Sequence, residues 1–293
     1  MDVSTAAEQL FFVTVNLQGT TDEGSSTGTG FLYQVETVSG DRAAFLVTNK
    51  HVLEGGAGEM KARLVQRTPD GRPKYGSPAT IDLEGVMEAS THHPDPNVDV
   101  AVSPFGQAIN VLTERGTPPF VRHLPAEFAL TREKAEELDA LEEVVFVGYP
   151  SNLFDQANLT PIMRRGSTAT PVALDYGGKP AFLIDAAVFP GSSGSPVLLF
   201  DRGMYATREG PTRVGSRVIL LGVLAAVYVR QVAAELVHTR LGAVFQDPLN
   251  LGIVYKTEAI DFCVDEALRK AGARRKTTPA SSVPAVPPVE GTS

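Results

Sequence analysis

The sequence predicts an all-β protein made of two antiparallel β-barrels and a C-terminal helix. Apolar residues recur at every second position in two blocks of short segments, and β-branched residues dominate the first block. Between the blocks this alternation stops, and an amphipathic segment follows the second block. Two blocks of short strands with one terminal helix favour two barrels packed side by side.

The first block, residues 1–104, is expected to form the first barrel. Its predicted strands cover 9–17, 29–37, 43–49, 60–67, 79–83 and 98–103. Residues 105–142 are expected to connect the two barrels. They begin with loop-like material and contain one helix-forming stretch at 131–140, with Thr131 as a candidate N-cap.

The second block, residues 143–256, is expected to form the second barrel. Its predicted strands cover 143–148, 161–169, 171–175, 181–185, 196–200, 217–229 and 251–255. A helix is predicted over 257–272, because Ile260, Cys263, Val264 and Leu268 share one face. Residues 273–293 are rich in Pro, Ser, Thr and Ala, a composition that predicts a disordered tail.

Charge and cysteine content exclude several classes of protein. The net charge is −8, so the sequence argues against nucleic acid or an anionic membrane as the main partner. One cysteine, Cys263, rules out an intramolecular disulfide and favours a reducing compartment. No basic segment precedes the short apolar stretch at 10–15, and the apolar run at 218–229 is too short to span a bilayer. We therefore expect a cytoplasmic protein.

Three segments carry residues suited to nucleophilic catalysis. The turn Gly191-Ser-Ser-Gly-Ser-Pro196 presents serine hydroxyls beside backbone N–H groups, as attack on a carbonyl requires. His51 follows an apolar strand-like run, and an imidazole can take up and return a proton near neutral pH. Asp99 lies between the two, at the start of a third apolar segment. Histidine, aspartate and serine therefore occur in that order, each at the edge of a predicted strand.

These segments resemble those of trypsin-like serine proteases, and most closely the bacterial HtrA/Deg-type branch. The similar stretches are Gly28-Thr-Gly-Phe31, Phe45 to Leu53, Asp99 to Val102 and Asp185 to Pro196, and the resemblance runs from about Phe11 to about Phe262. It implies a pair of six-stranded barrels with the active site in the seam between them. We expect no PDZ domain after the terminal helix, unlike in many proteins of that branch.

The resemblance also implies a role for each site residue. In the family pattern the reactive serine is Ser193, and Ser192 and Ser195 fill neighbouring slots. The N–H groups of Gly191 and Ser193 would form the oxyanion hole, and Pro190 would help to set that turn. His51 would act as general base and Asp99 would orient it. Asp99 is preferred to Asp95, which lies between two prolines in a loop-like stretch.

The resemblance also bears on substrate specificity and on control of activity. The family's first specificity pocket would be lined by Ala186, Ala187 and Val188, and by Leu224, Ala225 and Ala226. None is charged, so we predict cleavage after small or medium apolar residues. Position 192 is Ser, not the acidic residue that zymogen activation of the digestive kind uses. If activity is controlled, we expect loop ordering, an activating partner or an oligomer to do it.

The leading hypothesis is a serine endopeptidase that acts on protein or peptide substrates through an acyl-enzyme on Ser193. It would need no cofactor and no metal, because His92 and His93 lack further ligands at suitable spacing. The alternative is a catalytically idle relative that binds peptides or scaffolds a complex. An esterase is weaker, because Gly-x-Ser-x-Gly does not fit around Ser193 and the order Ser, acid, His is reversed.

Overall fold

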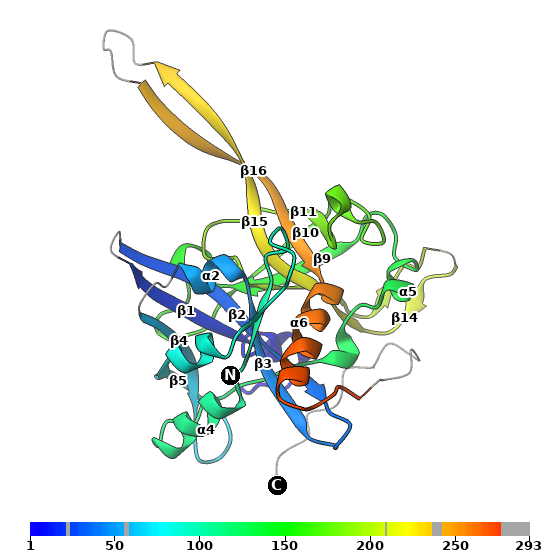
Figure 1. Cartoon of the computed structure of the whole chain (residues 1–293). Helices are drawn as coiled ribbons and strands as arrows, with labels where there is room; N and C mark the ends of the chain where they lie inside the picture. The colour runs from blue at the N-terminus through cyan, green and yellow to red at the C-terminus, as the bar shows by residue number, and fades with distance from the viewer. Residues whose placement is uncertain (22–23, 56–58, 209, 236–241, 277–293) are drawn as a thin grey trace.

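The computed structural model describes residues 1–21, 24–55, 59–208, 210–235 and 242–276 (Figure 1). Its first half is an eight-stranded sheet in the order β5-β4-β1-β2-β3-β7-β6, with β8 paired to β2. The strands are β1 (Thr14–Thr21), β2 (Gly24–Glu36), β3 (Arg42–Thr48), β4 (Glu59–Arg67), β5 (Pro73–Asp82), β6 (Thr91–His92), β7 (Ala101–Pro104) and β8 (Leu124–Pro125).

This first sheet departs from the expected six-stranded barrel. Its path has two ends, β5 and β6, and no pairing joins them in the part of the chain that the structure describes. A second closed barrel is therefore not confirmed. β6 has only two residues and β7 has four. These strands therefore offer few backbone N–H and C=O groups for the hydrogen bonds that would close the sheet.

The second half does close. Six strands form a barrel in the order β10-β11-β16-β15-β12-β9. They are β9 (Glu143–Gly148), β10 (Ile162–Thr168), β11 (Ala181–Asp185), β12 (Pro196–Asp201), β15 (Arg217–Glu235) and β16 (Gly242–Lys256). A two-stranded sheet of β13 (Met204–Tyr205) and β14 (Arg213–Val214) lies between β12 and β15 in the chain. The predicted strand at 171–175 is wrong: Pro171 has no N–H for a ladder, and its carbonyl accepts from Leu174 in a turn.

Several helical segments differ from expectation. The predicted strand at 9–17 starts late, because a capping box between Thr5 and Glu8 begins α1 (Ala6–Leu10). The connector contains α4 (Gly106–Glu114), where a loop was expected. The helix predicted at 131–140 is only α5 (Arg132–Ala135), although Thr131 caps it as expected. The other short helices are α2 (Lys50–Glu54), α3 (Glu84–Glu88), η1 (Ala126–Phe128), η2 (Pro150–Asn152) and η3 (Tyr176–Gly178).

The C-terminal helix α6 (Thr257–Lys270) packs against strands of both halves, β7 and β15. Its buried face includes Ile260, Cys263, Val264 and Leu268, the residues predicted to share it. Residues 273–276 follow along β2, where Lys276 donates its N–H to the Glu36 carbonyl. The remainder of the predicted tail, 277–293, lies outside the described residues. None of the described helices is long and apolar enough to cross a membrane.

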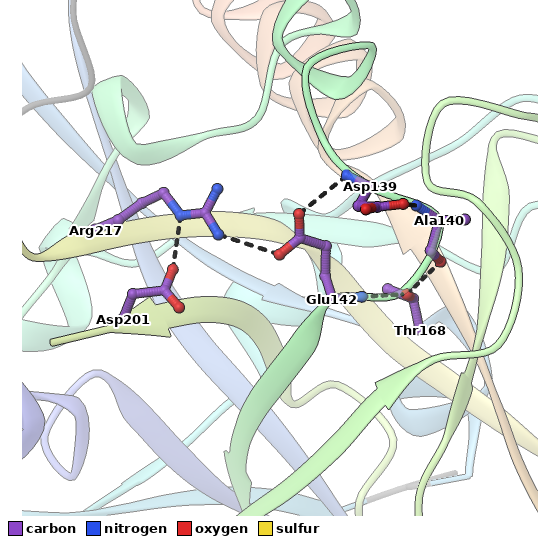
Figure 2. A network of polar contacts seen from close by, with 6 residues as sticks. All are labelled: Asp139, Ala140, Glu142, Thr168, Asp201 and Arg217. Carbon is purple, nitrogen blue, oxygen red and sulfur yellow. Dashed lines mark hydrogen bonds and ion pairs between the residues drawn. The ribbon is translucent and has the colours of Figure 1, made fainter. Parts of the chain in front are cut away.

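A buried arginine forms ion pairs that connect several segments at one end of the barrel (Figure 2). Arg217 at the start of β15 pairs with Asp201 at 2.6 Å and with Glu142 at 3.1 Å, and its guanidinium stacks on Tyr205. Glu142 also accepts from the Asp139 N–H, and its own N–H donates to the Thr168 hydroxyl. The network therefore joins β12, β15, the end of β10 and the segment before β9.

Replacing Arg217 by methionine is expected to lower the free energy of unfolding by about 3 kcal/mol or more. The substitution keeps much of the apolar stem but leaves the Asp201 and Glu142 carboxylates unpaired beside the barrel. Urea unfolding followed by circular dichroism measures the loss. Arg202→Met is the matched control, because Arg202 is exposed and lies over the Phe200 ring. Equal stability of the two variants would contradict the prediction.

His123, just before β8, should make folding sensitive to acid. Burial, reinforced by the charge of Arg122, lowers its pKa from 6.5 to about 4. Its Nε2 atom is buried and has no hydrogen-bond partner among the described residues. The unfolded chain therefore binds this proton more readily, and stability falls as pH drops from 6.5 towards 4, by about 3 kcal/mol in total.

The measurement is the free energy of unfolding at several pH values for the unaltered protein, His123→Gln and the control His92→Gln, whose ring is exposed. We expect His123→Gln to lose about 3 kcal/mol less than the unaltered protein between pH 7 and 4. The control should follow the unaltered protein. Parallel curves for all three would contradict the assignment to His123.

Candidate active site

The structure brings His51 and Asp99 together. His51 lies in α2, directly after β3, and its ring Nδ1 is 2.5 Å from Asp99 Oδ2. The His51 backbone N–H donates to the other carboxylate oxygen at 3.2 Å. From the other side, the Asn49 side chain donates to the Asp99 carbonyl at 2.6 Å. Asp99 is therefore fixed at both its carboxylate and its backbone by the residues around the start of α2.

The Asp99 carboxylate is held in its charged form. Burial raises its pKa, but the hydrogen bonds from the ring and backbone of His51 and from the backbone of Lys50 lower it by more, so the pKa lies below its ordinary value. Asp95, the other candidate, lies in an exposed loop and accepts instead from the backbone and side chain of Asn97. His51 is thus paired with Asp99 and not with Asp95.

Burial distinguishes the three serines of the turn before β12. Ser192 and Ser195 are 2% and 0% exposed, and neither hydroxyl has a hydrogen-bond partner among the described residues. Ser193 is partly exposed, and its hydroxyl donates to the Ala225 carbonyl on β15 at 2.8 Å. No hydrogen bond joins Ser193 to His51 in the described chain. Ser193 is therefore the accessible serine, with its hydroxyl directed to β15.

The turn is anchored to the first sheet by Thr29, which sequence reasoning missed. The Thr29 N–H donates to the Ser193 carbonyl at 2.8 Å, and its hydroxyl donates to the Gly191 carbonyl at 2.9 Å. The same hydroxyl accepts from the Tyr149 N–H at 3.1 Å. Thr29 thus holds the turn from the side of β2 and ties it to the end of β9.

A second missed residue, Ser151, orients the peptide that carries the Gly191 N–H. Its backbone N–H donates to the Pro190 carbonyl at 2.5 Å. Because a trans peptide is planar, this bond turns the Gly191 N–H to the opposite side. The N–H groups of Gly191 and Ser193 donate to no acceptor within the described residues. Both are therefore free to donate to an acceptor outside the described residues.

The Ser151 turn has an uncommon backbone. Ser151 has φ 48° and Asn152 has φ 57°, so two consecutive residues other than glycine adopt the left-handed conformation. The Asn152 side chain accepts from Gln18 on β1 at 3.2 Å. This contact links the first sheet to the segment that orients the Gly191 peptide.

The predicted specificity residues whose side chains the structure describes are buried, except Ala187. Val188 (3% exposed) and Leu224 (0%) are packed in the core of the barrel, and Ala186 and Ala225 are also buried. Ala187 is exposed, and its carbonyl accepts from the Arg164 guanidinium, a charged neighbour that the sequence did not indicate. The side chain of Ala226 lies outside the described part of the structure. Among the described residues, no group of three His, Cys, Asp or Glu side chains is placed to hold a metal ion.

Solved structures with similar topology include several proteases. The HtrA-type protease AlgW with a tripeptide has 18% identity and a TM-score of 0.46 over 91% of this chain and 63% of its own. The serine endoprotease from Yersinia pestis has 14% identity and a TM-score of 0.45, over 92% of this chain and 69% of its own. A catalytically inactive tobacco etch virus protease with substrate has 13% identity and a TM-score of 0.45, over 96% of this chain and 92% of its own. The present chain thus spans less than two thirds of the AlgW chain.

The family of the chain is identified by its amino-acid sequence. No curated protein matches the chain. A family model described as the trypsin-like peptidase domain matches residues 28–204, a region that contains His51, Asp99 and Ser193. The match covers more than half of the chain, which therefore belongs to the trypsin-like peptidase domain family.

Proposed function

We propose that this protein is a serine endopeptidase in which Ser193 is the nucleophile, His51 the general base and Asp99 the residue that orients it. The observation that supports this most strongly is the pair of unoccupied N–H groups, on Gly191 and Ser193, beside the accessible serine. Donors placed where negative charge develops are the largest single contribution in many acyl-transfer sites.

The reaction would begin with rotation of the Ser193 hydroxyl from the Ala225 carbonyl to His51 Nε2. His51 takes the proton as Ser193 Oγ attacks the substrate carbonyl carbon, and the carbonyl oxygen becomes an oxyanion. His51 then gives the proton to the leaving amine, and an acyl-serine remains. Water, deprotonated by His51, releases the acid and restores the serine.

Asp99 would act through His51. The carboxylate accepts from Nδ1–H, which keeps Nε2 free to accept the serine proton, and its charge stabilises the imidazolium that forms. The lowered pKa of Asp99 supports this role, because the carboxylate stays ionised as pH falls through the ordinary range for aspartate.

We further propose peptide or protein substrates with a small or medium apolar residue before the scissile bond. Support comes from Val188 and Leu224, whose uncharged side chains are packed in the barrel core and offer no counter-ion to a Lys or Arg side chain. A cytoplasmic location is proposed because the single cysteine is buried and makes no disulfide.

One observation favours the idle alternative. Ser193 donates to the Ala225 carbonyl and not to His51, so a protein held in this arrangement would bind peptides without cleaving them. The alternative therefore differs from the leading proposal in the reactivity of a single hydroxyl.

Labelling with a fluorophosphonate tests the proposal. We expect the unaltered protein and Ser192→Ala to be labelled covalently and Ser193→Ala not to be labelled. Ser192→Ala is the matched control because it removes a neighbouring hydroxyl that has no partner among the described residues. Absence of labelling in the folded unaltered protein would overturn the peptidase proposal in favour of the idle alternative.

A further inference from the structure

The loop that carries Asp99 lies at the boundary between the two halves of the chain. Residues 94–99 connect β6 to β7 and belong to neither strand. Two of them are prolines, which have no N–H to donate. On the side of the first half, the Lys50 ammonium donates to the Asp95 carbonyl at 2.8 Å. The first half therefore holds the beginning of this loop at Asp95 and its end at Asp99.

A tyrosine of the second half holds the middle of the loop. Tyr255 lies on β16, and its hydroxyl donates to the Asn97 carbonyl at 2.6 Å. The same hydroxyl is hydrogen-bonded to the backbone of Asp99. Within the described chain, no backbone N–H donates to the Asn97 carbonyl, and the Asp99 N–H donates to no carbonyl. One phenol oxygen therefore bonds the backbone on both sides of Val98.

The environment of Tyr255 keeps this hydroxyl in place and protonated. The side chain is 6% exposed and packs in the apolar cluster that also contains Val98 and Val100. Burial raises the pKa of Tyr255, and the Asp99 carboxylate acts in the same direction, although the hydrogen bond with the Asp99 backbone opposes them. The hydroxyl therefore keeps its proton at neutral pH and can donate to the Asn97 carbonyl.

The strand of Tyr255 also leads to the turn that carries Ser193. Tyr255 pairs with Val223 on β15. The next residue on that strand, Leu224, is bonded at both its N–H and its carbonyl to the turn. A short path of hydrogen bonds therefore runs from the loop of Asp99 through Tyr255 to the turn of the nucleophile.

We propose that Tyr255 is a positioning residue for catalysis. Its hydroxyl holds the Asp99–His51 pair in place relative to Ser193. Thr29 joins the two halves at the turn that carries Ser193, and Tyr255 joins them at the loop that carries Asp99. A site divided between two halves needs both connections, because small displacements of reacting groups cause large losses of rate. This inference rests on the proposed function, since a rate can be lost only if the protein cleaves peptides.

The first test is Tyr255→Phe, which removes the hydroxyl and keeps the ring. We expect kcat on a cleaved peptide to fall by about 10-fold, the usual effect of one lost hydrogen bond, with KM nearly unchanged. Tyr33→Phe is the matched control, because Tyr33 is 0% exposed and its hydroxyl donates to Asp261 on α6 at 2.9 Å. The control should lose stability in urea unfolding and keep its kcat. An unchanged kcat in Tyr255→Phe, or an equal loss in both variants, would overturn the proposal.

A double variant shows whether Tyr255 acts through Asp99. In the Asp99→Asn background the carboxylate is absent, so removal of the Tyr255 hydroxyl should change kcat by less than about 2-fold. Both backgrounds are measured on the same peptide. If Tyr255→Phe lowers kcat by about 10-fold in each of them, the two residues act independently and the proposal is overturned.

The ring tautomer of His51 gives a readout that needs no turnover. A carboxylate that accepts from Nδ1–H holds the neutral ring in one tautomer, and the ¹⁵N chemical shifts of the two ring nitrogens report which tautomer is present. The measurement is ¹H–¹⁵N correlation of ¹⁵N-labelled histidines at a pH at which imidazoles are neutral, with His51→Gln to assign the signal. We expect Tyr33→Phe to keep the Nδ1–H tautomer of the unaltered protein and Tyr255→Phe to shift part of the population to Nε2–H. An unchanged tautomer in Tyr255→Phe would overturn the proposal.

Fluorophosphonate labelling of the unaltered protein separates this inference from the proposed function. A shifted tautomer in Tyr255→Phe without labelling would overturn the peptidase function and leave Tyr255 as the residue that positions Asp99. Labelling with an unchanged tautomer and an unchanged kcat would overturn the role of Tyr255 and leave the peptidase function.

Discussion

Replacing Asp99 by asparagine is expected to lower kcat by about 10⁴-fold and to leave KM nearly unchanged. The carboxylate is 2.5 Å from Nδ1 of His51 and accepts from the His51 backbone N–H. An amide keeps the shape but offers an N–H₂ group to the ring, which then carries its proton on Nε2. That tautomer cannot accept the proton of Ser193, whereas substrate binding does not require it.

The measurement is kcat and KM on a cleaved peptide, with Asp95→Asn as the matched control. Asp95 is four residues away, and its carboxylate accepts from Asn97. The control should retain the kcat of the unaltered protein. If Asp99→Asn stays within about 10-fold of the unaltered kcat, Asp99 is not the residue that orients His51.

The strands were predictable where a segment is short, apolar and bounded by turn residues. β9 and β11 lie at the residues that the sequence indicates, 143–148 and 181–185. α4 was missed because only Ala108 and Leu112 of its residues are buried, and two positions do not establish a helical period. Closure of a sheet into a barrel depends on pairing between its end strands. The alternation of apolar and polar residues within each strand does not show which strands will pair.

The residues of the candidate site that the sequence predicted are those with reactive side chains. His51, Asp99 and Ser193 each lie next to a strand, and the chemistry of each side chain follows from the residue type. Ser151 acts through its backbone N–H, which every residue type other than proline has. Thr29 acts through its N–H and its hydroxyl, but a threonine in a strand is too common a residue to mark a site. One signal was present for Thr29: the glycines on either side of it. A Cβ at Gly28 would lie 2.4 Å from Val52, and one at Gly30 would lie 2.6 Å from Leu46.

Gly191→Ala is expected to lower kcat by about 10²- to 10³-fold, the usual effect of losing one oxyanion donor. Gly191 has φ +83°, which disfavours any residue with a Cβ. The added Cβ would lie 2.6 Å from the Tyr149 carbonyl oxygen and 3.0 Å from the Ser151 nitrogen. The turn must therefore shift, and with it the peptide whose carbonyl accepts from Ser151 and whose N–H is the proposed oxyanion donor.

The control that isolates this displacement from backbone strain is Gly203→Ala. Gly203 has φ +89°, close to that of Gly191, but a Cβ there would meet no atom within 4 Å. Both variants therefore carry the left-handed penalty, of about 1 kcal/mol, in the free energy of unfolding. Only Gly191→Ala moves an oxyanion donor, so kcat and the rate of fluorophosphonate labelling should fall in that variant alone. Equal kcat in the two variants would mean that the Gly191 N–H does not stabilise the transition state.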